Sequence, residues 1–378
     1  MKVYPPPLTV WVGRVAGRIG DPVARLRFLK AVAPIHVEQR AGRYRRWLAA
    51  VLVVLLGLVV WMSIAWARMR VAIPPKIVQA GPPPALSAAQ PAALPDIWMV
   101  ERSGEEEMYS NGLRIDNHFR VSTHGRGYLA FPAAGGAAVR RQEIAGIVFH
   151  TTESLQAPFE ARDNGVLLRL GESLLEYVRR RQAYNFVIDR FGRIYRVVPE
   201  TDAANHSGYS AWADDQWLYI DLNEGFLGVA FEAASPAAAG PSDISTAQVR
   251  SAAMLVEWLR AAYRIPAANC VTHAQVSVNP SNMLVGMHRD WASGFPFESL
   301  GLPDNYAQAL PAIWAYGFDC DAEFRGRVGV RMQAGIETAR AVLIRRAADA
   351  GLSPAQYRKK LRQHYHEMKA AVQRHQPP

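Results

Sequence analysis

Three side chains stand at or just beyond the ends of apolar segments: His150 in IVFHTT, His273 in VTHAQ and Asp290 in MHRDWASGFP. The end of a strand places its side chain at the rim of a sheet, where loops form clefts. Two neutral imidazoles and one carboxylate can hold a tetrahedral Zn²⁺ and leave its fourth position open. Water bound at that position has a pKa of about 7, and the metal polarises a carbonyl oxygen. The three residue types therefore predict a hydrolytic zinc centre.

Each of the three residues has a plainer interpretation when it is taken alone. A histidine at a strand end is more often a hydrogen-bonded polar residue than a metal ligand, and Asp290 could cap a turn. No short H-E-x-x-H spacing joins the three residues. From spacing alone, a metal centre and a set of structural polar residues both stay open.

The segments that must position these residues alternate between strand and helix patterns. Strand patterns cover 119–132, 144–152, 184–198 (a hairpin that turns at Phe191 and Gly192), 226–234 and 269–275. Apolar residues at helical spacing cover 167–181, 242–265 (capped by Ser245 or Thr246) and 333–374 (with a break at 351–354). The alternation predicts an α/β fold, a mixed central β-sheet flanked by helices.

Several of these segments occur in the order found in one known family. They are IVFHTTES, AYNFVIDRFGRIYRVVPE, ANHSGYSAW, FLGVAFEAA, the long helix before NCVTHAQ, and HRDWASGFPFESL. Through them, residues 142–302 resemble the zinc-dependent N-acetylmuramoyl-L-alanine amidases of the amidase type 2 and peptidoglycan recognition protein superfamily. The resemblance implies that fold, with zinc held by His150, His273 and Asp290. It also implies cleavage of the amide between N-acetylmuramic acid and L-alanine of the stem peptide.

The resemblance implies a catalytic role for Tyr184. In one branch of the family a tyrosine at the start of the hairpin lies beside the zinc water, and Tyr184 stands at that place. Other members use a glutamate in the later strand, where this chain has Ala230, with Glu232 two residues farther on the same face. Tyr184 is therefore predicted to orient the water or to shuttle its proton. A buried core tyrosine is the alternative.

His288 departs from the family pattern. Relatives carry Lys-x-Asp, in which the lysine stabilises the oxyanion, whereas this chain has His288-Arg289-Asp290. The imidazole is predicted to take the lysine's role, with a limit near neutral pH where it loses its proton. Two alternatives stay open: Arg289 substitutes for the lysine, or His288 is itself a ligand and Asp290 supports it. The Pro-Gly that follows the family's aspartate is missing, and the interval before that aspartate is longer than in the family.

Three further residues are predicted to bind substrate. His206, in NHSGYS, matches a family position near the substrate, Trp212 could line a groove for the glycan, and Thr151 follows the first predicted ligand. The alternatives are a structural loop histidine and ordinary packing of a tryptophan.

Residues 47–66, WLAAVLVVLLGLVVWMSIAW, carry no charge. As a helix rising about 1.5 Å per residue they are long enough to cross roughly 30 Å of hydrocarbon. A cleavable signal peptide has a shorter apolar core, of about 7 to 15 residues. Ten basic residues against two acidic ones precede the span, so its N-terminus is predicted to be cytoplasmic. The predicted parts are 1–46 cytoplasmic leader, 47–66 transmembrane helix, 67–96 Pro/Ala-rich linker, 97–310 periplasmic amidase-like domain and 311–378 C-terminal helical extension.

A net charge of +10 could indicate a protein that binds nucleic acid. Much of this excess comes from the leader and the C-terminal tail, and the central region shows no basic stripe, so no nucleic-acid partner is predicted. Cys270 and Cys320 both fall on the exported side, where a disulfide is permitted, and the sequence leaves open whether they meet.

Together these features predict a single-pass protein of the bacterial inner membrane whose periplasmic domain is a zinc amidase acting on peptidoglycan or muropeptides. The alternative from another class is a catalytically inactive peptidoglycan receptor or tether with the same fold. The histidine at position 288 and the missing Pro-Gly favour that alternative.

Overall fold

The computed structural model describes residues 15–21, 24–25, 27–28, 94–235 and 243–375. The chain divides into two compact units, Met1–Ser87 and Ala88–Pro378. None of the helices in the described ranges is long and apolar enough to cross a membrane. The predicted transmembrane helix at 47–66 and residues 67–93 of the predicted linker lie outside the described residues.

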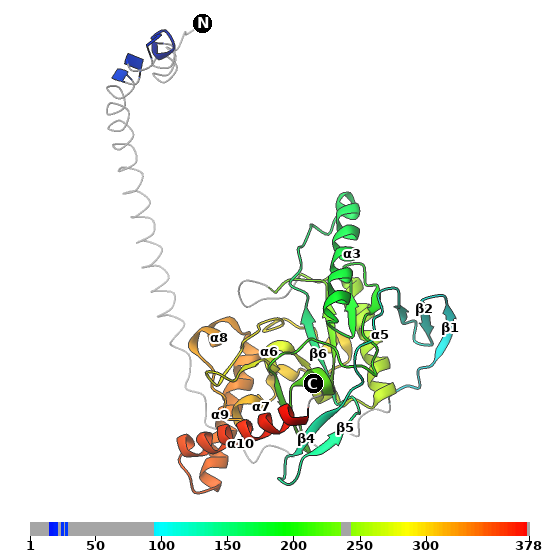
Figure 1. The fold of residues 1–378 in the computed structure, drawn as a ribbon, viewed down its shortest axis with the longest axis vertical. Coiled ribbons are helices and arrows are strands. Elements are labelled where there is room, and N and C mark those ends of the chain that lie inside the picture. Colours follow the sequence, from blue (N-terminus) through cyan, green and yellow to red (C-terminus); the bar gives the residue numbers. More distant parts are fainter. Residues whose placement is uncertain (1–14, 22–23, 26, 29–93, 236–242, 376–378) are drawn as a thin grey trace, which may run out of the picture. The chain divides into compact units, whose positions relative to one another are not determined.

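An eight-stranded sheet lies at the centre of the second unit (Figure 1), with strand order β1-β2-β3-β8-β7-β11-β6-β12. Its strands are β1 (Met99–Ser103), β2 (Glu106–Tyr109), β3 (Arg114–Asp116), β6 (Gly146–Thr151), β7 (Phe186–Ile188), β8 (Ile194–Arg196), β11 (Phe226–Phe231) and β12 (Cys270–Thr272). β6 pairs in parallel with β11 and β12, and β11 pairs in parallel with β7. β7 and β8 are antiparallel, so the predicted mixed sheet is confirmed.

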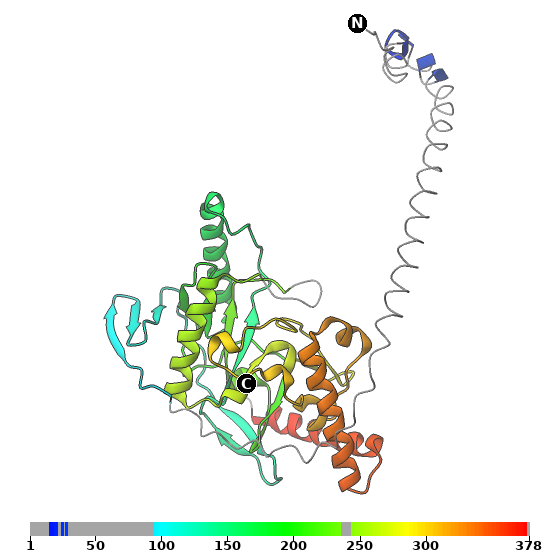
Figure 2. The ribbon, with the colours of Figure 1, turned by 180° about the vertical axis from the view of Figure 1, so that it is seen from behind.

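Helices α3 (Asn164–Arg181) and α5 (Thr246–Tyr263) cover opposite faces of this sheet (Figures 1 and 2). From α3, Leu174, Leu175 and Val178 pack in one core cluster with Val187 of β7 and Ala230 of β11. The neighbours of these strand residues point the other way and pack with α5. Successive side chains of a strand alternate between faces, so the continuous apolar runs in β6, β7 and β11 follow from burial on both sides.

A capping box fixes the start of α5 and confirms Ser245 as its cap. The Ser245 hydroxyl accepts a hydrogen bond from the Gln248 backbone N–H, and Gln248 Oε1 accepts one from the Ser245 N–H. Gln248 Nε2 also donates to the carbonyls of Ile188 and Glu232. The capped end of α5 is thereby joined to the sheet beside β7 and β11.

The prediction of one strand over 119–132 is wrong for its first part. Only β4 (Tyr128–Pro132) is a strand, and it belongs to a separate antiparallel sheet with order β5-β4-β10-β9. The other strands of that sheet are β5 (Val139–Arg141), β9 (Ala211–Ala213) and β10 (Trp217–Ile220). Side-chain hydrogen bonds hold the preceding segment, 119–127, in place of the backbone hydrogen bonds of a strand. The buried Arg126 guanidinium donates to the carbonyls of Glu200 and Phe226.

The hairpin of β7 and β8 has a longer turn than predicted. The strands are separated by residues 189–193, because Asp189 Oδ1 accepts hydrogen bonds from the backbone N–H groups of Phe191 and Arg193. Gly192 has φ +81°, the left-handed conformation that glycine adopts at little cost. The predicted two-residue turn is therefore wrong, while the antiparallel pairing is confirmed.

Of the C-terminal helices, α7 (Pro311–Trp314) and α10 (Pro354–His375) pack onto the smaller sheet. The others are α8 (Ala322–Arg327) and α9 (Val330–Asp349), and the gap between α9 and α10 confirms the predicted break. α10 contacts β4 and β10, and the Tyr316 hydroxyl bonds the carbonyls of Trp212 and Tyr219. Residue 310, the predicted domain boundary, thus falls inside one compact unit. Cys270 and Cys320 are buried free thiols, so no disulfide joins them.

Candidate metal centre

His150, His273 and Asp290 converge although they lie far apart in the sequence. His150 Nδ1 lies 3.1 Å from Asp290 Oδ2, and His273 Nδ1 lies 2.8 Å from Asp290 Oδ1. The three possible ligand atoms lie within 4.8 Å of one another, and all three residues are buried. Among the described residues, these three form the group of histidine, cysteine and acidic side chains that is compatible with a metal ion.

Strand alternation decides where the His150 side chain points. On β6, Ile147 and Phe149 join the core beneath α5, whereas Val148 packs with the smaller sheet on the opposite side. His150 shares the face of Val148 because the two residues are two positions apart. Its partner in the parallel register with β11 is Ala230, a small residue that leaves space beside the imidazole.

His273 begins a one-turn helix, α6 (His273–Val276), and does not lie in the predicted strand at 269–275. β12 ends at Thr272, whose N–H and hydroxyl both donate to Gln275 Oε1. The Ala274 N–H donates to the Asp290 carbonyl over 3.1 Å. This bond joins the backbones of the two segments that carry the second histidine and the aspartate.

The long interval before Asp290 is occupied by a small hairpin. It consists of β13 (Val278–Asn279) and β14 (Leu284–Val285), after which the chain returns to the site. Where the family has Pro-Gly, Trp291 is buried between Phe231 and Phe295, and its carbonyl accepts a 2.7 Å hydrogen bond from Tyr306. A packed aromatic side chain thus holds the segment that carries Asp290.

The hydrogen bonds around the two histidines determine which ring nitrogens carry protons. His206 Nε2 lies 3.3 Å from the Phe226 carbonyl, which can only accept, so His206 Nδ1 is the nitrogen without a proton. His150 Nε2 lies 3.1 Å from that nitrogen and must be the donor. His273 Nε2 donates to the Ser207 carbonyl over 3.3 Å.

In the neutral imidazoles, therefore, the Nδ1 lone pairs of His150 and His273 both face the carboxylate of Asp290. Two lone pairs and a carboxylate without a proton between them repel one another, and a cation resolves that repulsion. Imidazole nitrogen and carboxylate oxygen are the ligand types that zinc accepts. The residues present therefore fit a zinc ion.

Burial favours the protonation states that bind a metal. Burial lowers the pKa of His150 to about 4, so its imidazole is neutral at physiological pH. A histidine binds a metal through a nitrogen that carries no proton, so this shift favours metal binding.

Tyr184 lies beside this group. The centroid of its ring is 5.1 Å from that of His150. Its backbone has φ +56°, a left-handed conformation that is rare for a bulky residue and costs on the order of 1–3 kcal/mol. Tyr184 also lines a hollow of about 560 Å³, together with residues of α3 that include Tyr177. Burial raises the pKa of its phenol, which stays protonated.

His288 stacks on His273, with ring centroids 4.7 Å apart and an angle of 16° between the planes. It is exposed and does not belong to the metal-compatible group. Burial of part of its ring, and then His273, lower its pKa. Arg289 pairs with Glu323 on the surface, 3.0 Å away, so its guanidinium is engaged elsewhere.

Two of the predicted substrate-binding residues are buried. Trp212 is 1% exposed and its indole N–H donates to Asn269 Oδ1, so the predicted contact with a glycan is wrong: the side chain is core packing. Thr151 is 2% exposed, and its hydroxyl bonds Glu153 and lies 3.1 Å from that of Ser235. The structure therefore also contradicts a substrate contact by Thr151.

Glu232, the acid two residues beyond Ala230, does not reach the metal-compatible group. It is buried, and its carboxylate accepts a hydrogen bond from the Arg190 backbone N–H. Ser207 and Asn223 take part in the site and were missed from the sequence. Ser207 acts through its backbone carbonyl and Asn223 through a bond to backbone, and neither role leaves a residue-type signal.

Gly228 leaves room for the side chain of His206. A Cβ at position 228 would lie 2.6 Å from His206 Cγ, closer than real Cβ contacts occur. We expect Gly228→Ala to displace the His206 ring and to lower the free energy of unfolding by about 1–3 kcal/mol, a typical cost of overpacking. Chemical denaturation measures this change. Gly125→Ala, at a glycine without a left-handed backbone and with nothing within 4 Å of the added atom, controls for the loss of a glycine; equal stability of Gly228→Ala and the wild type would contradict the prediction.

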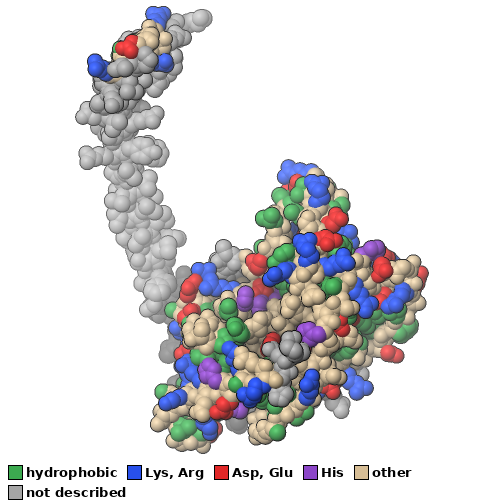
Figure 3. Space-filling model, in the orientation of Figure 1, with side chains coloured by type: hydrophobic (Ala, Val, Ile, Leu, Met, Phe, Trp, Pro, Cys, Tyr) green, Lys and Arg blue, Asp and Glu red, His purple; other side chains and the backbone are tan. Residues whose placement is uncertain are grey.

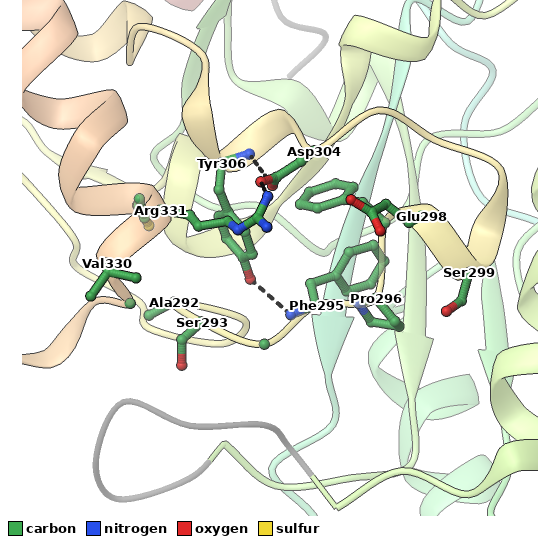
Figure 4. Close-up of a pocket in the computed structure, with 14 residues that line it drawn as sticks. Ala292, Ser293, Phe295, Pro296, Glu298, Ser299, Asp304, Tyr306, Val330 and Arg331 are labelled. Atoms are coloured by element: carbon green, nitrogen blue, oxygen red, sulfur yellow. Dashed lines mark hydrogen bonds and ion pairs between the residues drawn. The ribbon is translucent and has the colours of Figure 1, made fainter.

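The loop that follows Asp290 and the start of α9 line a separate pocket of about 390 Å³ (Figure 4). Tyr306 stands in it and accepts a hydrogen bond from the Phe295 N–H, while Asp304 pairs with Arg331 of α9. None of the metal-compatible residues lines this pocket. On the face of the molecule drawn in Figure 3, basic and acidic side chains are interspersed and form no continuous basic stripe.

Residues 140–291 match one protein family, described as N-acetylmuramoyl-L-alanine amidase. No curated protein sequence matches the chain. Among solved structures, it is similar to the N-acetylmuramyl-L-alanine amidase AmiD from E. coli, with 19% identity over 53% of this chain and 65% of that one and a TM-score of 0.32. AmpDh3 from Pseudomonas aeruginosa gives 19% identity over 42% and 58%, with a TM-score of 0.32. The amidase LysC from Clostridium intestinale gives 20% over 49% and 93%, with a TM-score of 0.26.

The chain thus spans less than two thirds of the first two of these structures. The family match covers all three metal-compatible residues and Tyr184, and it coincides with the segments whose order resembles the amidases. Residues 140–291 therefore form a domain of the N-acetylmuramoyl-L-alanine amidase type 2 superfamily.

Proposed function

We propose that this protein is a zinc-dependent peptidoglycan amidase. It hydrolyses the amide bond between N-acetylmuramic acid and L-alanine of the stem peptide, and a transmembrane helix at 47–66 anchors it to the bacterial inner membrane with the amidase domain in the periplasm. The observation that carries the proposal is the convergence of His150 Nδ1, His273 Nδ1 and the Asp290 carboxylate inside an amidase type 2 domain.

The three ligands and the residues around them have different roles in hydrolysis. Zinc held by His150, His273 and Asp290 supplies Lewis acidity toward the scissile carbonyl and makes a water molecule acidic near neutral pH. Tyr184, a neutral phenol beside His150, orients the attacking water by hydrogen bonding. His288, exposed on the outer side of His273, donates an N–H to the carbonyl oxygen as negative charge develops there. The water oxygen adds to the lactyl carbonyl carbon and the C–N bond breaks, so that the lactyl group becomes a carboxylate and the L-alanine amine leaves with a proton from the water.

The full-length protein in mild detergent, loaded with zinc, tests this proposal on purified muropeptides. We expect release of peptides with a new L-alanine amino group, detected by mass spectrometry, and loss of that product when a chelator removes the metal. Zinc-loaded protein that releases no such amine after prolonged incubation would reject the enzymatic function.

A catalytically inactive peptidoglycan receptor is the second candidate. His288 and the missing Pro-Gly favour it, and so does Ala230, which stands beside His150 in the register where other members carry a glutamate. Such a receptor would bind muropeptides with the same affinity before and after prolonged incubation and would leave them intact. Product formation in the test above distinguishes the two candidates.

We expect His288→Lys to extend activity to higher pH. In the wild type, activity that needs the protonated imidazole is present below the pKa of His288 and is lost as pH rises through it. That pKa is lower than usual because of burial and His273, so the loss begins at a lower pH than it would for an ordinary histidine. Lysine keeps its charge to about pH 10. The profiles of kcat/KM against pH for the two proteins measure the difference, and identical profiles would contradict the role of His288.

A further inference from the structure

Two consecutive residues of one loop contact the outer nitrogens of both histidine ligands. His206 bonds His150 Nε2 through its ring, and Ser207 accepts from His273 Nε2 through its backbone carbonyl. The two contacts lie on the sides of the imidazoles that face away from Asp290. A displacement of this loop would therefore disturb both ligands together.

Asn223 holds this loop in place. Its Oδ1 accepts hydrogen bonds from the His206 N–H (2.9 Å), the Ser207 N–H (2.7 Å) and the Ser207 hydroxyl (3.0 Å). The Asn223 side chain thereby fixes the backbone from which the His206 ring and the Ser207 carbonyl project. No hydrogen bond joins Asn223 to His150, His273 or Asp290 in the described part of the chain.

The far side of the His206 ring is fixed as well. Its Nε2 lies 3.3 Å from the Phe226 carbonyl, which also accepts from the buried Arg126 guanidinium over 2.9 Å. Gly228 leaves the space that the ring fills. Both ring nitrogens of His206 are thus engaged inside the protein, so neither is free to hydrogen-bond the peptide or sugar, which was its predicted role.

We infer that His206, Ser207 and Asn223 form a positioning device that sets the tautomers of both zinc-ligating histidines and thereby the affinity for zinc. The Phe226 carbonyl orients His206, His206 keeps the proton of His150 on Nε2, and Ser207 does the same for His273. Each histidine then presents an Nδ1 lone pair to the metal. His206 is a positioning residue that acts through His150, and Asn223 acts through the loop. The inference rests on the proposed zinc site but not on the proposed substrate.

Residues that hydrogen-bond the ring nitrogen that does not bind the metal typically weaken metal affinity by about 10–100-fold when they are removed. We expect His206→Leu, which fills a similar volume without a hydrogen-bonding nitrogen, to weaken zinc binding by that amount. His206→Gln keeps one donor and one acceptor and should restore part of the affinity. Asn223→Ala should also weaken zinc binding, although Asn223 bonds none of the ligands.

The test titrates metal-free full-length protein in detergent with zinc against a chromophoric chelator, and no substrate is present. His118→Leu is the matched control, because His118 is an exposed histidine paired with Asp116 and lies outside the site. Long-range proton–nitrogen NMR of the unaltered protein, labelled with ¹⁵N-histidine, adds a readout that needs no variant. With zinc bound, His150 and His273 should both carry protons on Nε2.

The outcomes separate this inference from the proposed function. Unchanged zinc affinity in His206→Leu, or NMR signals showing either histidine unprotonated at Nε2, would overturn the inference while the amidase proposal stands. Zinc binding that weakens as expected in a protein without amidase activity would support the inference and reject the enzymatic function. Absence of zinc binding by the wild type would overturn both.

Discussion

We expect Asp290→Asn to abolish hydrolysis and to weaken zinc binding by at least about 100-fold, beyond the range typical of residues that hydrogen-bond the ligands from outside. The carboxylate of Asp290 meets both histidine Nδ1 atoms within 3.1 Å, so it is the group on which the whole site converges. An amide of the same size carries no charge, and its NH₂ group can donate to an imidazole lone pair and so occupy the place of the metal. The zinc titration and the rate of amine release measure the two effects.

Thermal unfolding gives a second readout of the same substitution. A ligand at 1,000 times its Kd stabilises the folded state by about 4 kcal/mol, and one bound 100-fold more weakly at the same concentration by only about 1.4 kcal/mol. Zinc should therefore raise the Tm of the wild type much more than that of Asp290→Asn. Glu232→Gln is the control, because Glu232 is a buried carboxylate just beyond β11 that bonds the Arg190 backbone and not the site. An equal zinc-induced rise in Tm in Asp290→Asn and in the wild type would show that Asp290 is not a ligand.

The parts of the fold that could be predicted are those in which one pattern repeats over many residues. The apolar run 144–152 gave β6 because a strand buried on both faces has no polar alternation, and the helical spacing at 242–265 gave α5 with its Ser245 cap. The segment 119–127 was mistaken for a strand because its polar residues alternate with apolar ones. Its structure depends on Arg126, whose four nearest acceptors come from distant parts of the chain.

In the candidate site, too, some residues could be predicted from the sequence and others could not. The three ligand candidates were recognisable because histidine and aspartate at strand ends are conspicuous and because the order of the segments resembles a family. Ser207 and Asn223, which support these ligands, were not recognisable from the sequence. Ser207 contributes a backbone carbonyl, which every residue has, and Asn223 has the sequence context of an ordinary loop residue. Trp212 was misassigned because an indole suits a sugar-binding groove and a core equally well, and only its burial decides between them.

We expect Tyr184→Phe to lower kcat by about 100- to 10,000-fold, the range typical of a positioned acid–base group, and to leave zinc affinity unchanged. The phenylalanine keeps the ring that packs 5.1 Å from His150 and removes only the hydroxyl. A tyrosine that merely filled the core would lose little activity with this change. Single-turnover rates with zinc-saturated protein measure the chemical step separately from metal binding.

Tyr177→Phe is the matched control, because Tyr177 lines the same hollow from α3 and is exposed there. If both variants kept wild-type kcat, neither hydroxyl would orient the water, and Tyr184 would be a packing residue despite its left-handed backbone. A loss confined to Tyr184→Phe would instead explain why that backbone strain is retained. The conformation costs stability, and the ring that it places at the start of the hairpin lies beside that of His150.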